Sequence, residues 1–178
     1  MSGPESSTPD SSVTTPDWLG MARSASAALN LSGTDADSDL MRELLVIGVN
    51  GSAYAIAIER VREIVRTRAL TRIPRAPEWL LGVLALRGEV VEVVDLRRRL
   101  GVDPVEPGRS SRIIVLHGDG DRVTGVLVDS VSDVIRVGED QVVSAEGLEL
   151  SAVVEMCQRG TDFISILDID LVLGFSDD

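Results

Sequence analysis

This chain has few of the side chains on which disulfide frameworks, metal sites and catalysis depend. A single cysteine, Cys157, excludes a disulfide framework and a cysteine-rich metal site. It falls in a predicted strand, where a small buried apolar role is expected. The single histidine, His117, ends an apolar run, which favours a strand-end residue over a catalytic base. We therefore expect no enzyme, no cofactor and no metal site.

Long hydrophobic segments are also missing. No apolar stretch reaches the roughly 18 residues that a membrane-spanning helix needs, and no signal peptide is evident. The formal net charge is −12, from 29 acidic and 17 basic residues, and every basic residue is arginine. An acidic balance disfavours nucleic acid and anionic membranes as partners. We expect a cytoplasmic protein with no nucleic-acid partner and no direct membrane insertion.

The first 42 residues differ in composition from the rest. They are rich in Ser, Thr, Pro, Asp and Ala and poor in bulky apolar residues, so they bury too little surface to offset ordering entropy. We predict a disordered acidic tail over residues 1–42, with a short helix over 17–31. That helix is either marginal in isolation or a docking peptide anchored by Trp18. Residues 43–178 are the predicted folded domain.

The folded part contains an internal duplication. YAIAIERVREIVR at 54–66 resembles TGVLVDSVSDVIR at 124–136, a shift of 70 residues. LRGEVVEVVDLRRRLG at 86–101 resembles QRGTDFISILDIDLVLG at 158–174, at a shift of 72 that rises to 73. Two copies indicate a duplicated small module and not a solenoid. The predicted repeats cover about 44–101 and 112–174.

Each repeat reads as a set of short strands separated by turn signals. Gly51, Gly88 and Gly160 are the predicted structural turn residues, because hairpin loops need positive φ. A helical turn is expected near 60–65, and Asp95 and Asp168 are expected to start short helices. The fold class is therefore all-β with short helices: two five-stranded barrels, with a cleft between them. The predicted strands are 44–49, 53–58, 81–86, 90–94, 113–117, 123–128, 151–158 and 162–167.

Charged residues offer candidate sites. Carboxylates four apart recur in both repeats, as Glu59 and Glu63 and as Asp129 and Asp133, which favours a structural role. Arginines crowd between positions 60 and 75. They form either a solvated face or a basic patch that steers an acidic partner. The candidate patch residues are Arg60, Arg62, Arg66 and Arg68.

The motifs together resemble a known family. RVREIV, TRIPRAPEWLLGVLALRGEVVEVVDLRRRLG, RIIVL, GVLVDSVSDVI and FISILDIDLVLG follow one another in the order and spacing of the CheW family of bacterial chemotaxis adaptors. The resemblance covers about Glu43–Phe175. It implies two five-stranded SH3-like barrels without catalytic activity. The expected partners are the cytoplasmic tip of a chemoreceptor and the regulatory domain of a CheA-type histidine kinase.

The resemblance also implies which residues bind these partners. Arg87 occupies the arginine position of the family's N-L-R-G turn, which contributes to receptor contact. Gly82, Val61 and Glu63 occupy positions implicated in receptor or kinase binding. Recruitment to membrane-associated receptor arrays follows from the same resemblance.

The chain departs from the family pattern at several positions. Ala85 stands where the family usually has Asn, Glu92 stands where it usually has Pro, and VVEMCQRG lacks a common Gly. These departures leave open a divergent protein that binds receptor only and antagonises or localises the signalling complex. A phosphoryl-responsive coupling protein is disfavoured because the tail is too short for a receiver domain. An enzyme would need a pocket with convergent polar groups.

Overall fold

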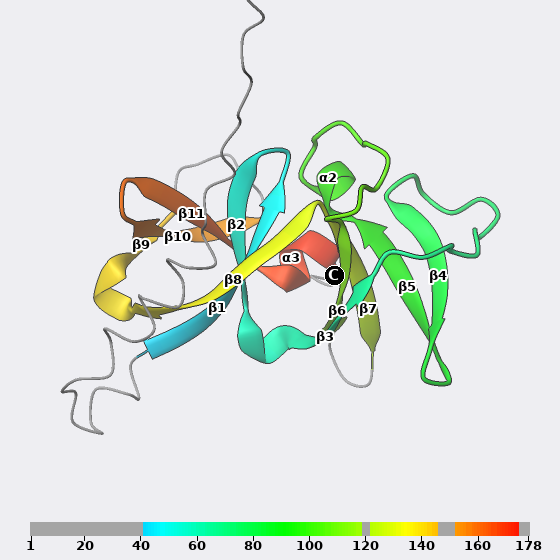
Figure 1. The fold of residues 1–178 in the computed structure, drawn as a ribbon, viewed down its shortest axis with the longest axis horizontal. Coiled ribbons are helices and arrows are strands. Elements are labelled where there is room, and N and C mark those ends of the chain that lie inside the picture. Colours follow the sequence, from blue (N-terminus) through cyan, green and yellow to red (C-terminus); the bar gives the residue numbers. More distant parts are fainter. Residues whose placement is uncertain (1–40, 119–121, 146–151, 175–178) are drawn as a thin grey trace, which may run out of the picture. The chain divides into compact units, whose positions relative to one another are not determined.

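The computed structural model describes residues 41–118, 122–145 and 152–174 (Figure 1). Nearly all of the predicted tail, including the helix predicted over 17–31, lies outside the described residues. Within the described ranges, no helix is long and apolar enough to cross a membrane.

The described chain folds into two β-sheets with four short helices. The first sheet has the order β8 (Ser130–Gly138), β1 (Met41–Val49), β2 (Ser52–Ala57), β11 (Asp162–Leu167), β10 (Val153–Arg159), β9 (Val142–Ser144). The second has the order β3 (Val61–Arg66), β6 (Arg112–His117), β7 (Val123–Val128), β5 (Glu89–Asp95), β4 (Leu80–Leu86). The helices are η2 (Ile58–Arg60), α2 (Leu96–Arg99), η3 (Glu139–Gln141) and α3 (Ile169–Leu173). The predicted all-β class with short helices is confirmed.

Two local predictions were wrong. The segment predicted as a helical turn near 60–65 is mostly strand β3, and only Ile58–Arg60 is helical. Its residues alternate between half-buried and exposed, which is the period of a strand. The first sheet has six strands and not five, because the short strand β9 pairs with β10. Its counterpart in the second sheet is a single bridge between Thr71 and Val83.

The sheets do not follow the two sequence repeats. Strands β1 and β2 belong to the first repeat but pair with β8 and β11 of the second, while β6 and β7 join the sheet of β3, β4 and β5. The connections explain this exchange. Three residues separate β2 from β3, and Asp129 alone separates β7 from β8. No described residue in either connection has the positive φ that a tight hairpin loop requires, so the chain runs on into the other sheet.

The duplication is visible in the strand register. In the second sheet, Glu92 pairs with Thr124 in a parallel ladder, and in the first sheet Ser165 pairs with Tyr54 in the same way. Ser165 is the repeat equivalent of Glu92 at a shift of 73, and Thr124 is the equivalent of Tyr54 at a shift of 70. Register irregularities also recur: one lies between Leu80 and Gly82, and another between Val153 and Glu155. The two halves therefore share one backbone plan down to their bulges.

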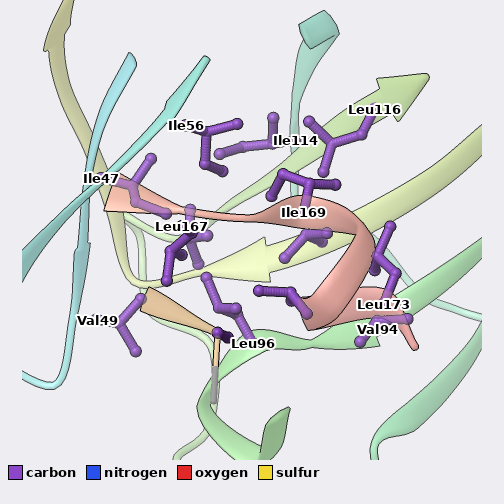
Figure 2. Close-up of a cluster of buried hydrophobic side chains, with 14 of the residues drawn as sticks. Ile47, Val49, Ile56, Val94, Leu96, Ile114, Leu116, Leu167, Ile169 and Leu173 are labelled. Carbon is purple, nitrogen blue, oxygen red and sulfur yellow. The ribbon is translucent and has the colours of Figure 1, made fainter. Parts of the chain in front are cut away.

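The cleft predicted between the barrels is filled by hydrophobic core. One buried cluster takes side chains from both sheets and from helices α2 and α3. Figure 2 shows Ile169 and Leu173 of α3 among residues of both sheets, including Ile47 and Ile114. Two smaller clusters each consist of residues from one sheet. Cys157 lies fully buried in one of them, as predicted, and burial raises the pKa of its thiol.

Helices α2 and α3 hold the halves together through two ion pairs. Asp95 and Asp168 cap the helices by accepting backbone N–H bonds, as predicted. Arg97 of α2 donates to both carboxylate oxygens of Asp129, at 2.8 and 2.6 Å. Arg60 of η2 donates in the same way to Asp170 of α3, at 2.9 and 2.6 Å. Each pair joins one repeat to the other.

Gly82 is required by a close approach of two backbone segments. Its φ is 145°, which side-chain-bearing residues rarely adopt, and a Cβ there would lie closer than 3.0 Å to the carbonyl oxygen of Thr71. Thr71 and Val83 exchange two backbone hydrogen bonds at this point, of 3.0 and 2.8 Å. The glycine thus lets the segment after β3 pair with β4.

We expect Gly82→Ala to lower the free energy of unfolding by about 2 kcal/mol or more, because strained backbone and a backbone clash combine. Urea unfolding followed by circular dichroism measures the change. Gly108→Ala is the matched control: a Cβ at Gly108 meets no atom within 4 Å, so its effect should stay within about 0.5 kcal/mol. Equal effects of both substitutions would contradict this role of Gly82.

Stability should also depend on the carboxylate of Asp129. The hydrogen bonds from Arg97 lower the pKa of Asp129, outweighing its partial desolvation. A lowered pKa stabilises the fold above the unfolded-state pKa of 3.8, and this contribution is lost as the pH falls through the folded-state pKa. Linkage places the loss of this contribution at roughly pH 5 to pH 2. Over this pH range we expect the free energy of unfolding to fall less in Asp129→Asn than in the unsubstituted chain. An unchanged acid profile in Asp129→Asn, with Asp162→Asn as the control, would refute the assignment.

Candidate functional site

Arg87 lies in the two-residue turn between β4 and β5. Both turn residues have positive φ, 51° at Arg87 and 87° at Gly88, as in a type I′ turn. The turn between β1 and β2 has the same form at Asn50 and Gly51. Asparagine and glycine adopt this backbone readily, whereas arginine in it costs about 1–2 kcal/mol. An arginine kept at a strained turn position is a candidate for function.

The Arg87 side chain reaches Glu63 of β3 but stays in solvent. Its Nε lies 3.3 Å from Oε1 of Glu63, and its Nη2 lies 3.4 Å from Oε2. The Arg87 side chain is 73% exposed, against 20% for Glu63. An exposed pair at these lengths adds little stability. The guanidinium is therefore oriented by Glu63 and available to a partner.

Apolar side chains accompany this arginine. Val90 of β5 is 72% exposed, and Ala85, its cross-strand neighbour on β4, is exposed as well. Ile64 of β3 is a further exposed aliphatic residue, next in sequence to Glu63. An ion pair of 2.5 Å between Arg62 and Glu89 links β3 to the start of β5. We call Arg87, Glu63, Ala85 and Val90 the turn surface.

The predicted binding residues separate into two groups. Arg87 and Glu63 come together on the turn surface. Gly82 is buried beside Thr71, and Val61 packs against the core between the sheets. Gly82 and Val61 therefore have structural roles in the fold, and their roles in binding stay predictions.

The predicted basic patch is likewise divided. Arg60 is engaged by Asp170 and by the backbone oxygen of His117, whose own side chain is exposed at the end of β6. Arg62 is paired with Glu89. Arg66 and Arg68 are exposed, at and just beyond the other end of β3.

The second half of the chain carries a counterpart of the turn surface that sequence reasoning missed. Arg159 of β10 lies 3.2 Å from Asp133 of β8. These residues match Arg87 and Glu63 at shifts of 72 and 70. Gly160 follows Arg159 with a φ of 62°, as Gly88 follows Arg87. Applying the repeat shifts to Arg87 would have found the pair.

The arrangement does not form a metal site in the described part of the chain. No group of three or more His, Cys, Asp or Glu that could hold a metal occurs there. Glu63 and Asp133 lie on strands and not on helices, and each binds an arginine. Cationic turns and exposed aliphatic residues on a rigid sheet scaffold suit the docking of another protein. The fold and this surface define a duplicated two-sheet docking module.

Comparison with known proteins agrees with this class. A family model described as the CheW-like domain matches residues 43–175. The chain belongs to the CheW-like family, as the sequence motifs predicted.

Characterised relatives span most of the chain. The chemotaxis protein CheW of Bacillus subtilis is 33% identical over 135 residues, which cover 74% of this chain and 86% of the relative. The chemotaxis protein CheW of Klebsiella aerogenes is 31% identical over 137 residues, covering 75% and 82%. The crystal structure of the scaffolding protein TtCheW from Thermoanaerobacter tengcongensis superposes with a TM-score of 0.69 at 26% identity, covering 73% of this chain and 91% of that one.

Proposed function

We propose that this chain is a non-catalytic adaptor of chemotaxis signalling that couples chemoreceptors to a CheA-type histidine kinase. The main support for this proposal is the match of the CheW-like family model to residues 43–175, together with relatives named as chemotaxis and scaffolding proteins. The structure offers a surface suited to the role, since Arg87 is held at a strained turn on a rigid pair of sheets.

The turn surface is the proposed receptor site. A receptor tip is helical, and a helix docks by laying aliphatic residues against an apolar surface. Val90 and Ala85 provide that surface, while Arg87 exchanges its weak contact with Glu63 for carboxylates or carbonyl oxygens of the partner. The family's asparagine is Ala85 here, so recognition at this position is apolar.

The kinase site is proposed at the edge formed by β3. This strand ends its sheet in the hydrogen-bonding order, and it carries Val61, Glu63 and the exposed Ile64. A kinase regulatory domain with the same barrel fold pairs with it barrel to barrel. Glu63 contacts Arg87, so the two docking surfaces adjoin. The adaptor is cytoplasmic in this proposal, and the receptors bring it to membrane-associated arrays.

We expect the full-length chain to bind the regulatory domain of a CheA-type kinase from the same organism with a Kd in the micromolar range, about −8 kcal/mol. Isothermal titration calorimetry measures this. Ile64→Asp should weaken binding about tenfold or more, because it places a charge in the apolar contact. Absence of binding by the folded chain would reject kinase coupling and leave the receptor-only alternative, in which receptor binding persists.

We expect Arg87→Asn to weaken binding to the helical tip of the cognate receptor by about tenfold or more. Asparagine suits the positive φ at this turn, so the melting temperature should be unchanged or higher. Arg159→Asn is the matched control, since it removes the equivalent arginine in the other sheet. Pull-down with receptor fragments and thermal unfolding measure the two effects. A large fall in melting temperature without loss of binding would make Arg87 a structural residue.

A further inference from the structure

A second cationic surface lies at the end of β3 remote from Arg87. Arg66 ends the strand, Arg68 follows it, and Arg112 begins the neighbouring strand β6. Arg109 joins them, because Arg112 Nη1 donates a 2.8 Å hydrogen bond to its backbone oxygen. We call Arg66, Arg68, Arg109 and Arg112 the arginine edge. About 10 Å of strand separates Arg66 from Glu63 of the turn surface.

These arginines differ from most others in the chain. Elsewhere in the described residues, arginines such as Arg42, Arg60 and Arg97 form ion pairs with carboxylates. No ion pair of the described residues includes a member of the arginine edge. Arg66, Arg68 and Arg109 are exposed, and Arg112 is half-buried. A local positive field therefore persists on a chain whose net charge is −12.

The strand register adds an energetic argument. Arg66 lies directly opposite Arg112 in the pairing of β3 with β6, and like charges directly opposite one another destabilise a sheet. The equivalent positions in the other sheet are Arg136 and Glu43. There the pair is attractive, with 2.7 Å between Arg136 Nε and Glu43 Oε1. At equivalent positions, the first sheet therefore has an ion pair and the second sheet has a repulsive pair.

We propose that the arginine edge is a docking site for an acidic protein segment. Carboxylates of the partner take the place opposite Arg66 and Arg112 that Glu43 takes opposite Arg136. Guanidinium groups bind carboxylates through two parallel hydrogen bonds, and such charge-assisted bonds are among the strongest. Binding also relieves the repulsion between Arg66 and Arg112, and this relief adds to the favourable free energy of the new contacts.

The rest of the surface charge favours a short protein segment over nucleic acid. Charges more than a Debye length away, about 8 Å at physiological salt, are screened. A segment with a few carboxylates therefore responds to the arginine edge alone. An extended polyanion would also meet the acidic remainder of the chain, which repels it. This site lies apart from Arg87 and adjoins the kinase surface proposed above, because Arg66 ends the strand β3 that carries Ile64.

The probe is a fluorescein-labelled hexaglutamate peptide, titrated with the full-length chain and followed by fluorescence anisotropy at low and physiological salt. We expect saturable binding that weakens with salt. The double substitution Arg66→Gln and Arg112→Gln should weaken it about tenfold or more. Arg136→Gln, which removes the counterpart of Arg66 in the other sheet, should leave it within about twofold.

A further variant separates binding from folding. Arg112→Glu recreates across β3 and β6 the ion pair that Glu43 and Arg136 make, so it should abolish peptide binding while the melting temperature stays equal or rises. Equal loss of binding in Arg136→Gln would show a general charge effect and overturn the proposal. Tighter binding of a hexanucleotide than of hexaglutamate, or a lower melting temperature in Arg112→Glu, would overturn it as well.

Discussion

The core shared by the two sheets is the constraint on which the rest of the structure depends. Because no described residue in the connections after β2 and β7 has the positive φ of a tight hairpin loop, the chain passes from one sheet to the other there, and each sequence repeat contributes strands to both sheets. Each sheet is therefore complete only when strands of both repeats are present. One buried cluster contains Ile169, Val172 and Leu173 of α3 together with residues of both sheets. Figure 2 shows Ile169 and Leu173 within it. The surfaces proposed for docking are consequently carried by sheets that share one core.

The ion pairs of the two helices specify how the two repeats pair, which the nonpolar core alone does not do. Arg97 of the first repeat binds Asp129 of the second, and Arg60 of the first binds Asp170 of the second. Arg97 and Asp170 are equivalent positions at a shift of 73, yet they carry opposite charges. Two identical repeats would place like charges against each other at one of these contacts. The opposite charges at these equivalent positions therefore favour pairing of the first repeat with the second over pairing of two copies of the same repeat.

Local sequence signals predicted the hairpins, the helix caps and the duplication, because each depends on a few neighbouring residues. Asn50-Gly51 and Arg87-Gly88 require particular backbone angles, and Asp95 and Asp168 satisfy nearby N–H groups. The exchange of strands between repeats was missed because pairing partners are set by tertiary packing. The turn surface was predicted only as far as Arg87 and Glu63, through family resemblance. The exposure of Val90 was missed because EVVEVV has no clear alternation. The close approach of Thr71 to Gly82 was missed because the sequence does not show contacts between distant backbone segments, and the binding role of Gly82 stays a prediction.

Duplication explains how one small fold presents several different surfaces. The shared backbone plan leaves equivalent positions in equivalent geometry, so a change of side chain alters recognition without altering the fold. Arg87 and Arg159 keep the same type of contact, with Glu63 and Asp133. Beside them, Val90 has become Phe163, which is larger and also exposed. At the strand ends, the first sheet has an attractive pair, Glu43 with Arg136, and the equivalent pair in the second sheet, Arg66 with Arg112, is repulsive. An adaptor needs such divergence, because its halves must share a core while they discriminate between partners.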